Sequence, residues 1–313
     1  MSAVATPIHV DTDPGTDDLL ALAVALGSPE LRVVGITTVA GNAPLKVVTD
    51  NALRFVTLAG GGIEVGAGAS QPLRAPPVTA EHVHGSDGRL GTPLPPSAHA
   101  SGDALEVLRR SLQDYGARQV VALGPLTNLA RLLETEPGLL DQVEIIWMGG
   151  TLSEGNVTRA AEFNCYADPD AAALVLGGGL PVRVVGLDVT HRVVLRSCDA
   201  PPGFFGLGPR SEMLSSLISR LLGTTGETNP DPSVILHDPC AVAACFAPEL
   251  FRFEPLNLSV RTDPPNRGRL VTVESEGRSS VRYATEVQGR EVVLLCLERL
   301  KRWAGEINTE EER

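Results

Sequence analysis

Four carboxylates lie within eight residues near the start of the chain, in the segment Asp11-Thr-Asp13-Pro-Gly-Thr-Asp17-Asp18. Ionised carboxylates a few ångströms apart repel one another, which raises their pKa values unless a cation lies among them. A Pro-Gly pair in the middle of the segment makes a turn. The segment therefore predicts a bound cation, a proton acceptor, or both.

The flanking residues predict where this segment lies. The short apolar run from Ile8 to Val10 precedes it, and the Leu- and Ala-rich residues 19–26 follow it. This order predicts a strand, a loop and a helix, with Asp17 and Asp18 near the helix start. N-terminal capping of that helix explains one or two of the carboxylates, but not four.

Further apolar runs end in polar or glycine-rich turns. These runs are Leu31 to Val39, Gln119 to Leu123, Val143 to Met148 and Val182 to Leu187. Helix-period segments separate them, and the β-branched runs are typical of strands buried on both faces. We therefore predict an α/β fold with a doubly wound, mostly parallel sheet and helices on both faces, in which the turns meet at the ligand-binding carboxyl edge.

The end of the chain has a different pattern. Alternating segments at 256–261, 270–274 and 281–286 predict short strands in a small C-terminal β appendage, and a helix from Glu291 to Trp303 closes the fold. A chain of this length commonly forms one continuous α/β domain, so residues 1–313 are expected to be a single domain.

Three regions carry further polar groups. Asn156, Glu162 and Asn164 lie on one loop, which could hold a hydroxylated ligand or simply face solvent. His237 stands beside Asp238, an arrangement found in acid/base chemistry but more often structural. The loop 71–100 contains a His-Val-His motif and could be a lid or a surface excursion.

Composition excludes several classes of function. The formal net charge is -12 and aromatic residues make up 4%, which argues against a nucleic-acid partner. Five cysteines without a CxxC pair form neither a disulfide framework nor a zinc spacing, so buried thiols are expected. No signal peptide or membrane-length apolar stretch is present, so we expect no membrane partner and a cytoplasmic location.

Four motifs together resemble the inosine-uridine preferring nucleoside hydrolase (nucleoside N-ribohydrolase) family. They are Asp11-Thr-Asp-Pro-Gly-Thr-Asp-Asp18, Thr37-Thr-Val-Ala-Gly-Asn42, Gly155-Asn156 with Glu162-Phe-Asn164, and His237-Asp238-Pro. The likeness spans nearly the whole chain. It implies a Rossmann-like enzyme that uses Ca²⁺ to hydrolyse ribonucleosides to ribose and free base in nucleoside salvage. We expect a homodimer or a homotetramer.

The resemblance also implies a ligand set for the cation. Asp13, Asp18 and Asp238 would bind Ca²⁺ with their carboxylates, and Leu123 with its main-chain oxygen, all of them donors that a hard cation prefers. Asp13 would in addition take a proton from a metal-bound water that attacks the anomeric carbon. We expect Asp11 to orient the other carboxylates from behind.

The substrate contacts follow from the same resemblance. They are Asp17, Asn42 and Asn164 for the ribose 2′- and 3′-hydroxyls, and Asn156 and Glu162 for the 5′-hydroxyl. His237 would assist departure of the base, and His82 and Met148 would complete the pocket. Several relatives place an aromatic residue before the His-Asp-Pro motif, but residues 206–236 contain no Tyr, Trp, Phe or His. Base preference therefore stays open between a pyrimidine pocket and one completed by the His82 loop.

Two other functions fit parts of the sequence. Asp11-x-Asp13 after an apolar strand has the spacing of a haloacid-dehalogenase-like phosphatase, but that hypothesis leaves Asn164 and His237-Asp238 without roles. A catalytically silent nucleoside or sugar binder would share the scaffold. Because every proposed ligand and the proposed base are present, nothing in the sequence explains a loss of chemistry.

Overall fold

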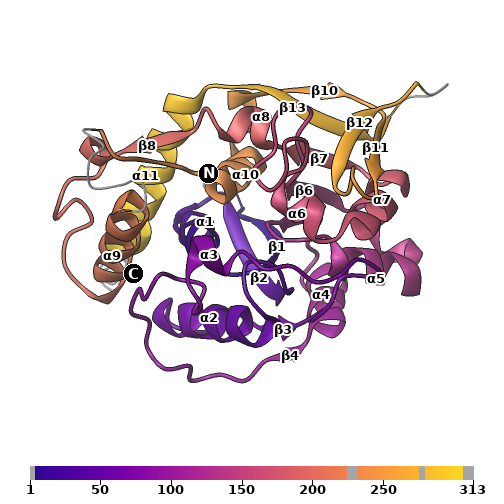
Figure 1. The fold of residues 1–313 in the computed structure, drawn as a ribbon. Helices are drawn as coiled ribbons and strands as arrows, with labels where there is room; N and C mark the ends of the chain where they lie inside the picture. The colour runs from indigo at the N-terminus through magenta and orange to yellow at the C-terminus, as the bar shows by residue number, and fades with distance from the viewer. Residues whose placement is uncertain (1–3, 224–230, 275–278, 306–313) are drawn as a thin grey trace.

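The main sheet runs through the centre of the molecule (Figure 1). The computed structural model describes residues 4–223, 231–274 and 279–305. Within them the sheet has nine strands in the order β10-β13-β7-β6-β5-β1-β2-β3-β4. The strands are β1 Thr6–Thr12, β2 Leu31–Thr38, β3 Val65–Ala67, β4 Gly102–Asp103, β5 Gln119–Ala122, β6 Glu144–Met148, β7 Val182–Val185, β10 Phe251–Pro255 and β13 Val281–Val287. Neighbouring strands pair in parallel, except that β10 is antiparallel to β13. The predicted doubly wound, mostly parallel sheet is confirmed.

Helices cover both faces of this sheet (Figure 1). The longer ones are α1 Thr16–Gly27, α2 Leu45–Leu58, α4 Ala104–Gln113, α5 Thr127–Thr135, α7 Pro169–Gly177, α9 Pro209–Gly223, α10 His237–Phe246 and α11 Gly289–Gly305. The shorter ones are α3 Glu81–His84, α6 Phe163–Ala167, α8 Leu187–Thr190 and the 3₁₀ turns η1 Pro137–Leu140, η2 Ser197–Asp199 and η3 Pro248–Leu250. Of the helices described, none is long and apolar enough to span a membrane.

Alternate residues of each central strand pack into two separate cores. On β6, Ile146 and Met148 lie in the core formed with α1, α10 and α11. Ile145 and Trp147 lie in the other core, with α4, α5 and α7. This burial on both faces is why the strands are nearly continuous apolar runs in the sequence.

The predicted C-terminal appendage is confirmed only in part. The strands β11 Leu258–Arg261 and β12 Arg269–Thr272 form an antiparallel hairpin outside the main sheet, and β8 Val194–Arg196 with β9 Ser233–Ile235 forms another. The segment predicted at 281–286, however, is β13, which pairs in parallel with β7 in the main sheet. Because Val281 and Tyr283 are buried and the residue between them is exposed, its alternation also fits a hairpin strand.

Helix α10 begins before its apolar run. The apolar residues start at Ala241, whereas α10 starts at His237, so that Asp238 lies in its first turn. Pro239 is tolerated there because the N–H groups of a first helical turn have no intrahelical partner. His237 and Asp238 are consequently held on a rigid helix end.

Candidate active site

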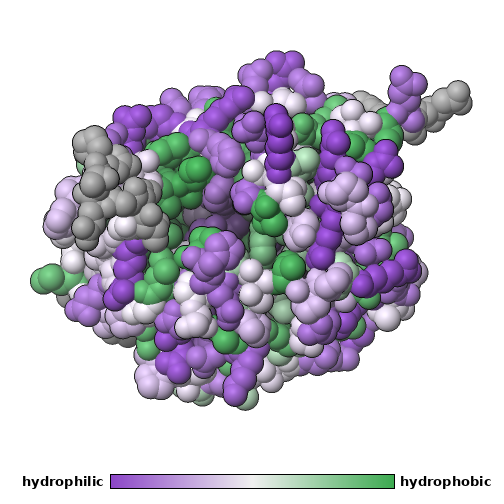
Figure 2. Space-filling model, in the orientation of Figure 1, coloured by the Kyte–Doolittle hydropathy of each residue, from purple (hydrophilic) through white to green (hydrophobic). Residues whose placement is uncertain are grey.

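A cavity of about 280 Å³ opens at the carboxyl edge of the parallel strands. Figure 2 shows this face hollowed near the centre of the view, between α3 and the start of α10 in Figure 1. The lining residues are Asp17, Asn42, Ala80, His82, Val83, His84, Leu123, Met148, Asn156, Val157, Glu162, Phe163, Asn164, His237 and Asp238. Every predicted site residue is among them except Asp11, Asp13 and Asp18, which are fully buried. The structure thus gathers residues from strand ends and loops that lie far apart in the chain.

Asp18 holds the acidic turn, residues 13–18, together. Its Oδ2 accepts a hydrogen bond from the Gly15 N–H (2.9 Å), and its Oδ1 accepts from the Asp13 N–H (3.3 Å) and the Thr12 hydroxyl (2.5 Å). The first of these bonds caps the N-terminus of α1. N-terminal capping is therefore confirmed for this one carboxylate, and the other three need a different explanation.

Asn42, in the turn after β2, braces the same carboxylates. Its main-chain N–H donates to Asp13 Oδ2 (2.7 Å), and its side-chain amide donates to Asp18 Oδ2 (2.9 Å) and to the Asp13 carbonyl (3.2 Å). Both amide hydrogens are used, so only the amide oxygen of Asn42 can contact a ligand. Asp13 itself lies between two glycines: a Cβ on Gly41 would come within 2.1 Å of its Oδ2, and one on Gly124 within 2.7 Å of its Oδ1.

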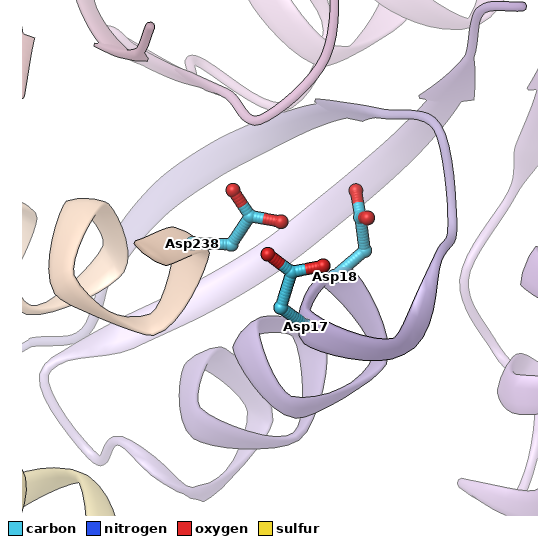
Figure 3. Close-up of side chains that lie close together, drawn as sticks. All are labelled: Asp17, Asp18 and Asp238. Atoms are coloured by element: carbon cyan, nitrogen blue, oxygen red, sulfur yellow. The ribbon is translucent and has the colours of Figure 1, made fainter. Parts of the chain in front are cut away.

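Three carboxylates converge at the base of the pocket (Figure 3). Asp17 and Asp18 come from the start of α1 and Asp238 from the first turn of α10, and one oxygen of each lies within 4.8 Å of the others. In the described structure Asp13 Oδ1 and Asp17 Oδ1 are buried without a hydrogen-bond partner. Unpartnered buried oxygens close to further carboxylates are the environment that a hard cation would stabilise.

The electrostatics of the cluster support this interpretation. Burial and the charge of Asp18 raise the pKa of Asp13 well above its usual range. Burial, followed by the charges of Asp17, Asp18 and Asp13, does the same for the pKa of Asp238. Without a cation these groups would hold protons, and a bound cation would favour their ionised forms.

The grouping differs in one member from the predicted ligand set. The prediction pairs Asp13 with Asp18, Asp238 and the Leu123 carbonyl, and assigns Asp17 to the sugar. The three closest carboxylates include Asp17 in place of Asp13. Asp17 thus lies where it could contact either a cation or a ribose hydroxyl.

The opposite wall of the pocket comes from the loop before α6. Glu162 caps this helix: its Oε1 accepts from the Asn164 N–H (2.8 Å), and its Oε2 accepts from the N–H groups of Gly150 (2.7 Å) and Cys165 (3.0 Å). Asn164 donates its amide to the carbonyls of Leu123 (2.6 Å) and Met148 (3.0 Å). Its amide oxygen is therefore the only side-chain atom left for a ligand.

Asn156 lies at the exposed rim of the same wall. Its Oδ1 accepts from the Phe163 N–H (2.9 Å), which leaves its NH₂ group for a ligand. The loop bearing Asn156, Glu162 and Asn164 therefore lines the pocket, where these residues could contact a ligand.

Besides His82, two further histidines, His237 and His84, line the pocket. The Nδ1 atom of His237 lies 2.8 Å from the Thr190 hydroxyl. Burial lowers the pKa of His237, and the neighbouring His191 adds to this effect. His84, the second histidine of the His-Val-His motif, is buried in the lining. Its Nδ1 accepts from the Thr16 N–H (3.2 Å), so the neutral ring carries its proton on Nε2.

Asp11 lies behind the acidic turn, on β1. Its Oδ1 accepts from the Thr37 hydroxyl (2.5 Å) and the Asn128 amide (2.7 Å), and burial raises its pKa to about 6. These hydrogen bonds run to β2 and α5 rather than to the other three carboxylates. The expected orienting effect of Asp11 on Asp13 would therefore act through the backbone of β1.

Fold and pocket together define an α/β enzyme whose site, at the carboxyl edge of a doubly wound sheet, presents carboxylates, amides and histidines to a small polar ligand. A profile of the inosine-uridine preferring nucleoside hydrolases matches residues 8–293. The chain belongs to the inosine-uridine preferring nucleoside hydrolase family, and it is a hydrolase that acts on N-glycosyl compounds. The phosphatase alternative is thereby excluded.

Relatives of known name agree with this assignment. The pyrimidine-specific ribonucleoside hydrolase RihA of Salmonella enteritidis is 40% identical over 258 residues, which cover 79% of this chain and 82% of that protein. The solved structure of a purine-preferring ribonucleoside hydrolase from Gardnerella vaginalis superposes with a TM-score of 0.88 at 29% identity, covering 95% of this chain and 98% of that one. A plant nucleoside hydrolase gives a TM-score of 0.85 at 32% identity, with 94% and 98% covered.

Proposed function

We propose that this protein hydrolyses the N-glycosidic bond of ribonucleosides in the acidic pocket, with Ca²⁺ as cofactor, and releases ribose and the free base. The observation that carries the proposal is the pair of buried, unpartnered oxygens, Asp13 Oδ1 and Asp17 Oδ1, beside the clustered carboxylates of Asp18 and Asp238. Such oxygens are costly to bury unless a cation or a ligand completes them.

The donor atoms fit a hard cation. Asp13, Asp18 and Asp238 would hold it together with the main-chain oxygen of Leu123, and all four supply oxygen. The Leu123 carbonyl already accepts from Asn164, but a carbonyl oxygen has a second lone pair. When bound, Ca²⁺ would lower the pKa of a coordinated water below that of bulk water and so ease transfer of its proton to Asp13.

Asp13 is the proposed general base. Its Oδ2 is held by the Asn42 N–H, while its Oδ1 has no partner and can accept a proton from the water that attacks the anomeric carbon. The close approach of Gly41 and Gly124 leaves the carboxylate little room to rotate. The surrounding carboxylates also stabilise the positive charge that develops on the ribosyl group.

The two walls are suited to opposite ends of the ribose. Asn42 and Asn164 can offer only their amide oxygens, so with Asp17 they would accept hydrogen bonds from the 2′- and 3′-hydroxyls. Asn156 would donate its free NH₂ group to the 5′-hydroxyl, and Glu162 would accept from it. Met148 lies between the walls and would contact the sugar ring.

Departure of the base is assigned to the histidines. His237 is held by Thr190 and its low pKa keeps the ring neutral, so it would donate a hydrogen bond rather than a full proton from an imidazolium. The Nε2–H of His84 is a second donor into the pocket, and His82 at the rim would line the base.

We further propose a preference for pyrimidine nucleosides. Among the lining residues described, Phe163 is the one aromatic side chain besides the histidines, and Ala80, Val83 and Val157 supply the apolar surface. The described lining contains no Tyr or Trp, so a purine would find only the Phe163 ring to stack on. The 40% identity to a hydrolase named pyrimidine-specific supports the same preference.

Ribose release from a panel of nucleosides tests the whole proposal. Uridine and cytidine with Ca²⁺ should yield free ribose faster than inosine and guanosine. A chelator or the Asp13→Ala substitution should stop the release, and added Ca²⁺ should restore it for the unsubstituted protein only. Ribose release that persists in chelator would contradict the cation assignment, and faster release from inosine would contradict the base preference.

We also propose that residues 1–313 act as one domain and assemble in the cytoplasm as a homodimer or homotetramer. The single-domain proposal is supported by the main sheet, which pairs strands from the start of the chain and from its end. Light scattering of the purified protein would measure the mass of the assembly, and a mass equal to one chain, 32.9 kDa, would contradict the oligomer.

A further inference from the structure

A single buried amide joins two of the loops that form the pocket. Asn51 lies in the middle of α2 and is fully buried. Its amide nitrogen donates to the carbonyls of Pro14 (3.1 Å) and Asp87 (2.9 Å), and its oxygen accepts from the Arg89 guanidinium (2.8 Å). Asn is a poor helix former compared with Ala or Leu, so its three hydrogen bonds are the physical reason for an amide at this position.

One of these loops is the acidic turn, residues 13–18, and the other is the histidine turn, residues 81–92, which carries His82 and His84. The two come into direct contact at Gly88, which has φ +70°. A Cβ there would lie 2.9 Å from the Asn51 amide nitrogen and 3.3 Å from the Pro14 carbonyl. Only glycine permits this approach without strain.

The histidine turn is tied together internally by Asp87 and Arg89. Asp87 accepts from the Arg89 and Gly91 N–H groups, and the Arg89 side chain donates to the Thr92 carbonyl (2.9 Å). The Leu90 N–H donates to the His84 carbonyl (2.8 Å). The turn would therefore move as a unit if its outer contacts were lost.

The two turns differ in how firmly the rest of the fold holds them. The acidic turn is braced from several sides by Asp18 and Asn42. Among the described residues, the side chains that link the histidine turn to other parts of the chain besides Asn51 are His84, which bonds to Thr16 in the acidic turn itself, and Arg220, which donates to the Leu90 carbonyl. Loss of the Asn51 bonds would therefore displace the histidine turn rather than the acidic one.

We propose that Asn51 is a positioning residue, which holds the histidine turn at a set distance from the acidic turn and so aligns His82 and His84 with the bond to be broken. The catalytic part of this inference rests on the proposed nucleoside hydrolysis. The positioning part does not, because it concerns only the placement of residues 81–92.

The substitution Asn51→Asp tests the bridge at constant side-chain size. It keeps an oxygen for Arg89 but sets a carboxylate oxygen against the carbonyls of Pro14 and Asp87. We expect kcat for uridine to fall by about 100-fold with KM changed by less than about threefold, as for a misplaced catalytic group. The control is Asp50→Ala, next to it on α2, whose side chain is 46% exposed and pairs with Arg54; it should leave both constants unchanged.

The leaving group separates positioning from general damage. With 4-nitrophenyl β-D-ribofuranoside the departing phenolate needs no proton, so Asn51→Asp should lower its hydrolysis by less than about fivefold. An equal loss on uridine and on this riboside would overturn the proposed alignment of the histidines. Arg89→Met removes the partner of the Asn51 oxygen and should give a selective loss of the same kind but of smaller magnitude. This variant replaces Asn51→Asp in the test if Asn51→Asp does not fold.

Hydrogen exchange tests the positioning without any activity. In Asn51→Asp and in Arg89→Met, peptides covering residues 81–92 should exchange at least about tenfold faster, while peptides covering the central strands keep their protection. Unchanged exchange at 81–92, or faster exchange throughout the chain, would overturn the inference. If the unsubstituted protein released ribose from no nucleoside, the proposed function would fail, and the exchange result would still decide the role of Asn51.

Discussion

Glu162, in one wall of the pocket, and Asp13, behind the acidic wall, are both buried carboxylates, but their oxygens have different surroundings. Three main-chain N–H groups satisfy Glu162, and none of them belongs to the acidic turn. Asp13 accepts one main-chain N–H on Oδ2, and its Oδ1 has no partner. Burial raises the pKa of both groups, and only for Asp13 does a neighbouring carboxylate add strongly to the shift.

The difference indicates separate tasks for the two walls. A carboxylate whose bonds are already made by the backbone contributes mainly to the fold of its loop, because removing it leaves buried donors unpaired. A carboxylate with an unpartnered oxygen contributes little to the fold and is available for a cation, a proton or a hydroxyl. Four predictions test this division, beginning with the one of largest effect.

Replacing the unpartnered carboxylate should abolish activity and preserve the fold. We expect Asp13→Ala to lower kcat for uridine by about 10⁴-fold, because it removes the proposed base together with a cation ligand. Ribose release measures the loss, and circular dichroism should match that of the unsubstituted protein. Activity within about tenfold of the original would remove Asp13 from the mechanism.

Replacing the satisfied carboxylate should have its main effect on stability. Glu162→Gln places an NH₂ group against main-chain donors, which should lower the free energy of unfolding by about 2–3 kcal/mol. Asp17→Asn, in chelator, should not lower it, because Asp17 Oδ1 has no partner to lose. Urea unfolding of both variants is the measurement, and equal losses would mean that the two walls do not differ as described.

A cation should stabilise the acidic wall specifically. Ca²⁺ added after chelation should raise the free energy of unfolding by about 2.7 kcal/mol at one hundred times its Kd. This gain should be lost in Asp238→Asn and kept in Glu162→Gln, because only Asp238 belongs to the cluster. Thermal unfolding with and without Ca²⁺ measures the gain, and a gain that survives Asp238→Asn would place the cation elsewhere.

The smallest expected effect concerns pH and two residues of β1, His9 and Asp11, which share Thr37 as a hydrogen-bond partner. Burial lowers the pKa of His9 from 6.5 to about 3, so below pH 6.5 the unfolded chain binds a proton that folded His9 does not, and stability falls. Burial raises the pKa of Asp11 from 3.8 to about 6, so its contribution has the opposite sign: stability falls as pH rises through this interval.

In chelator, His9→Gln should therefore shift the change in stability on acidification toward a gain, and Asp11→Asn should shift it toward a loss. Each change should reach at most about 1.4 kcal/mol per pH unit, the value for one proton. Urea unfolding between about pH 6.5 and pH 4.5 measures the slopes. Parallel slopes for all three proteins would show that neither residue keeps its shifted pKa.

Much of the fold could be predicted because it depends on local pattern. The apolar runs that became β1, β2, β5, β6 and β7 are buried on both faces, and a parallel arrangement follows from the helices between them. The exception is β13, one strand in from the sheet edge, whose alternation also fits a hairpin strand. There the partner strand decides the assignment, and pairing with β7 is not a local property.

The sequence by itself indicated that the turns after the parallel strands meet at one edge of the sheet, because every parallel strand delivers its following turn to the same edge. Only the tertiary structure decided which carboxylates are satisfied and which are left open, that Asp17 joins Asp18 and Asp238, that His84 lines the pocket, and that Asn51 joins two loops. The physical reason is distance: a hydrogen bond forms or fails within a few tenths of an ångström. The residues that form these hydrogen bonds lie far apart in the chain, so no local sequence pattern predicts them.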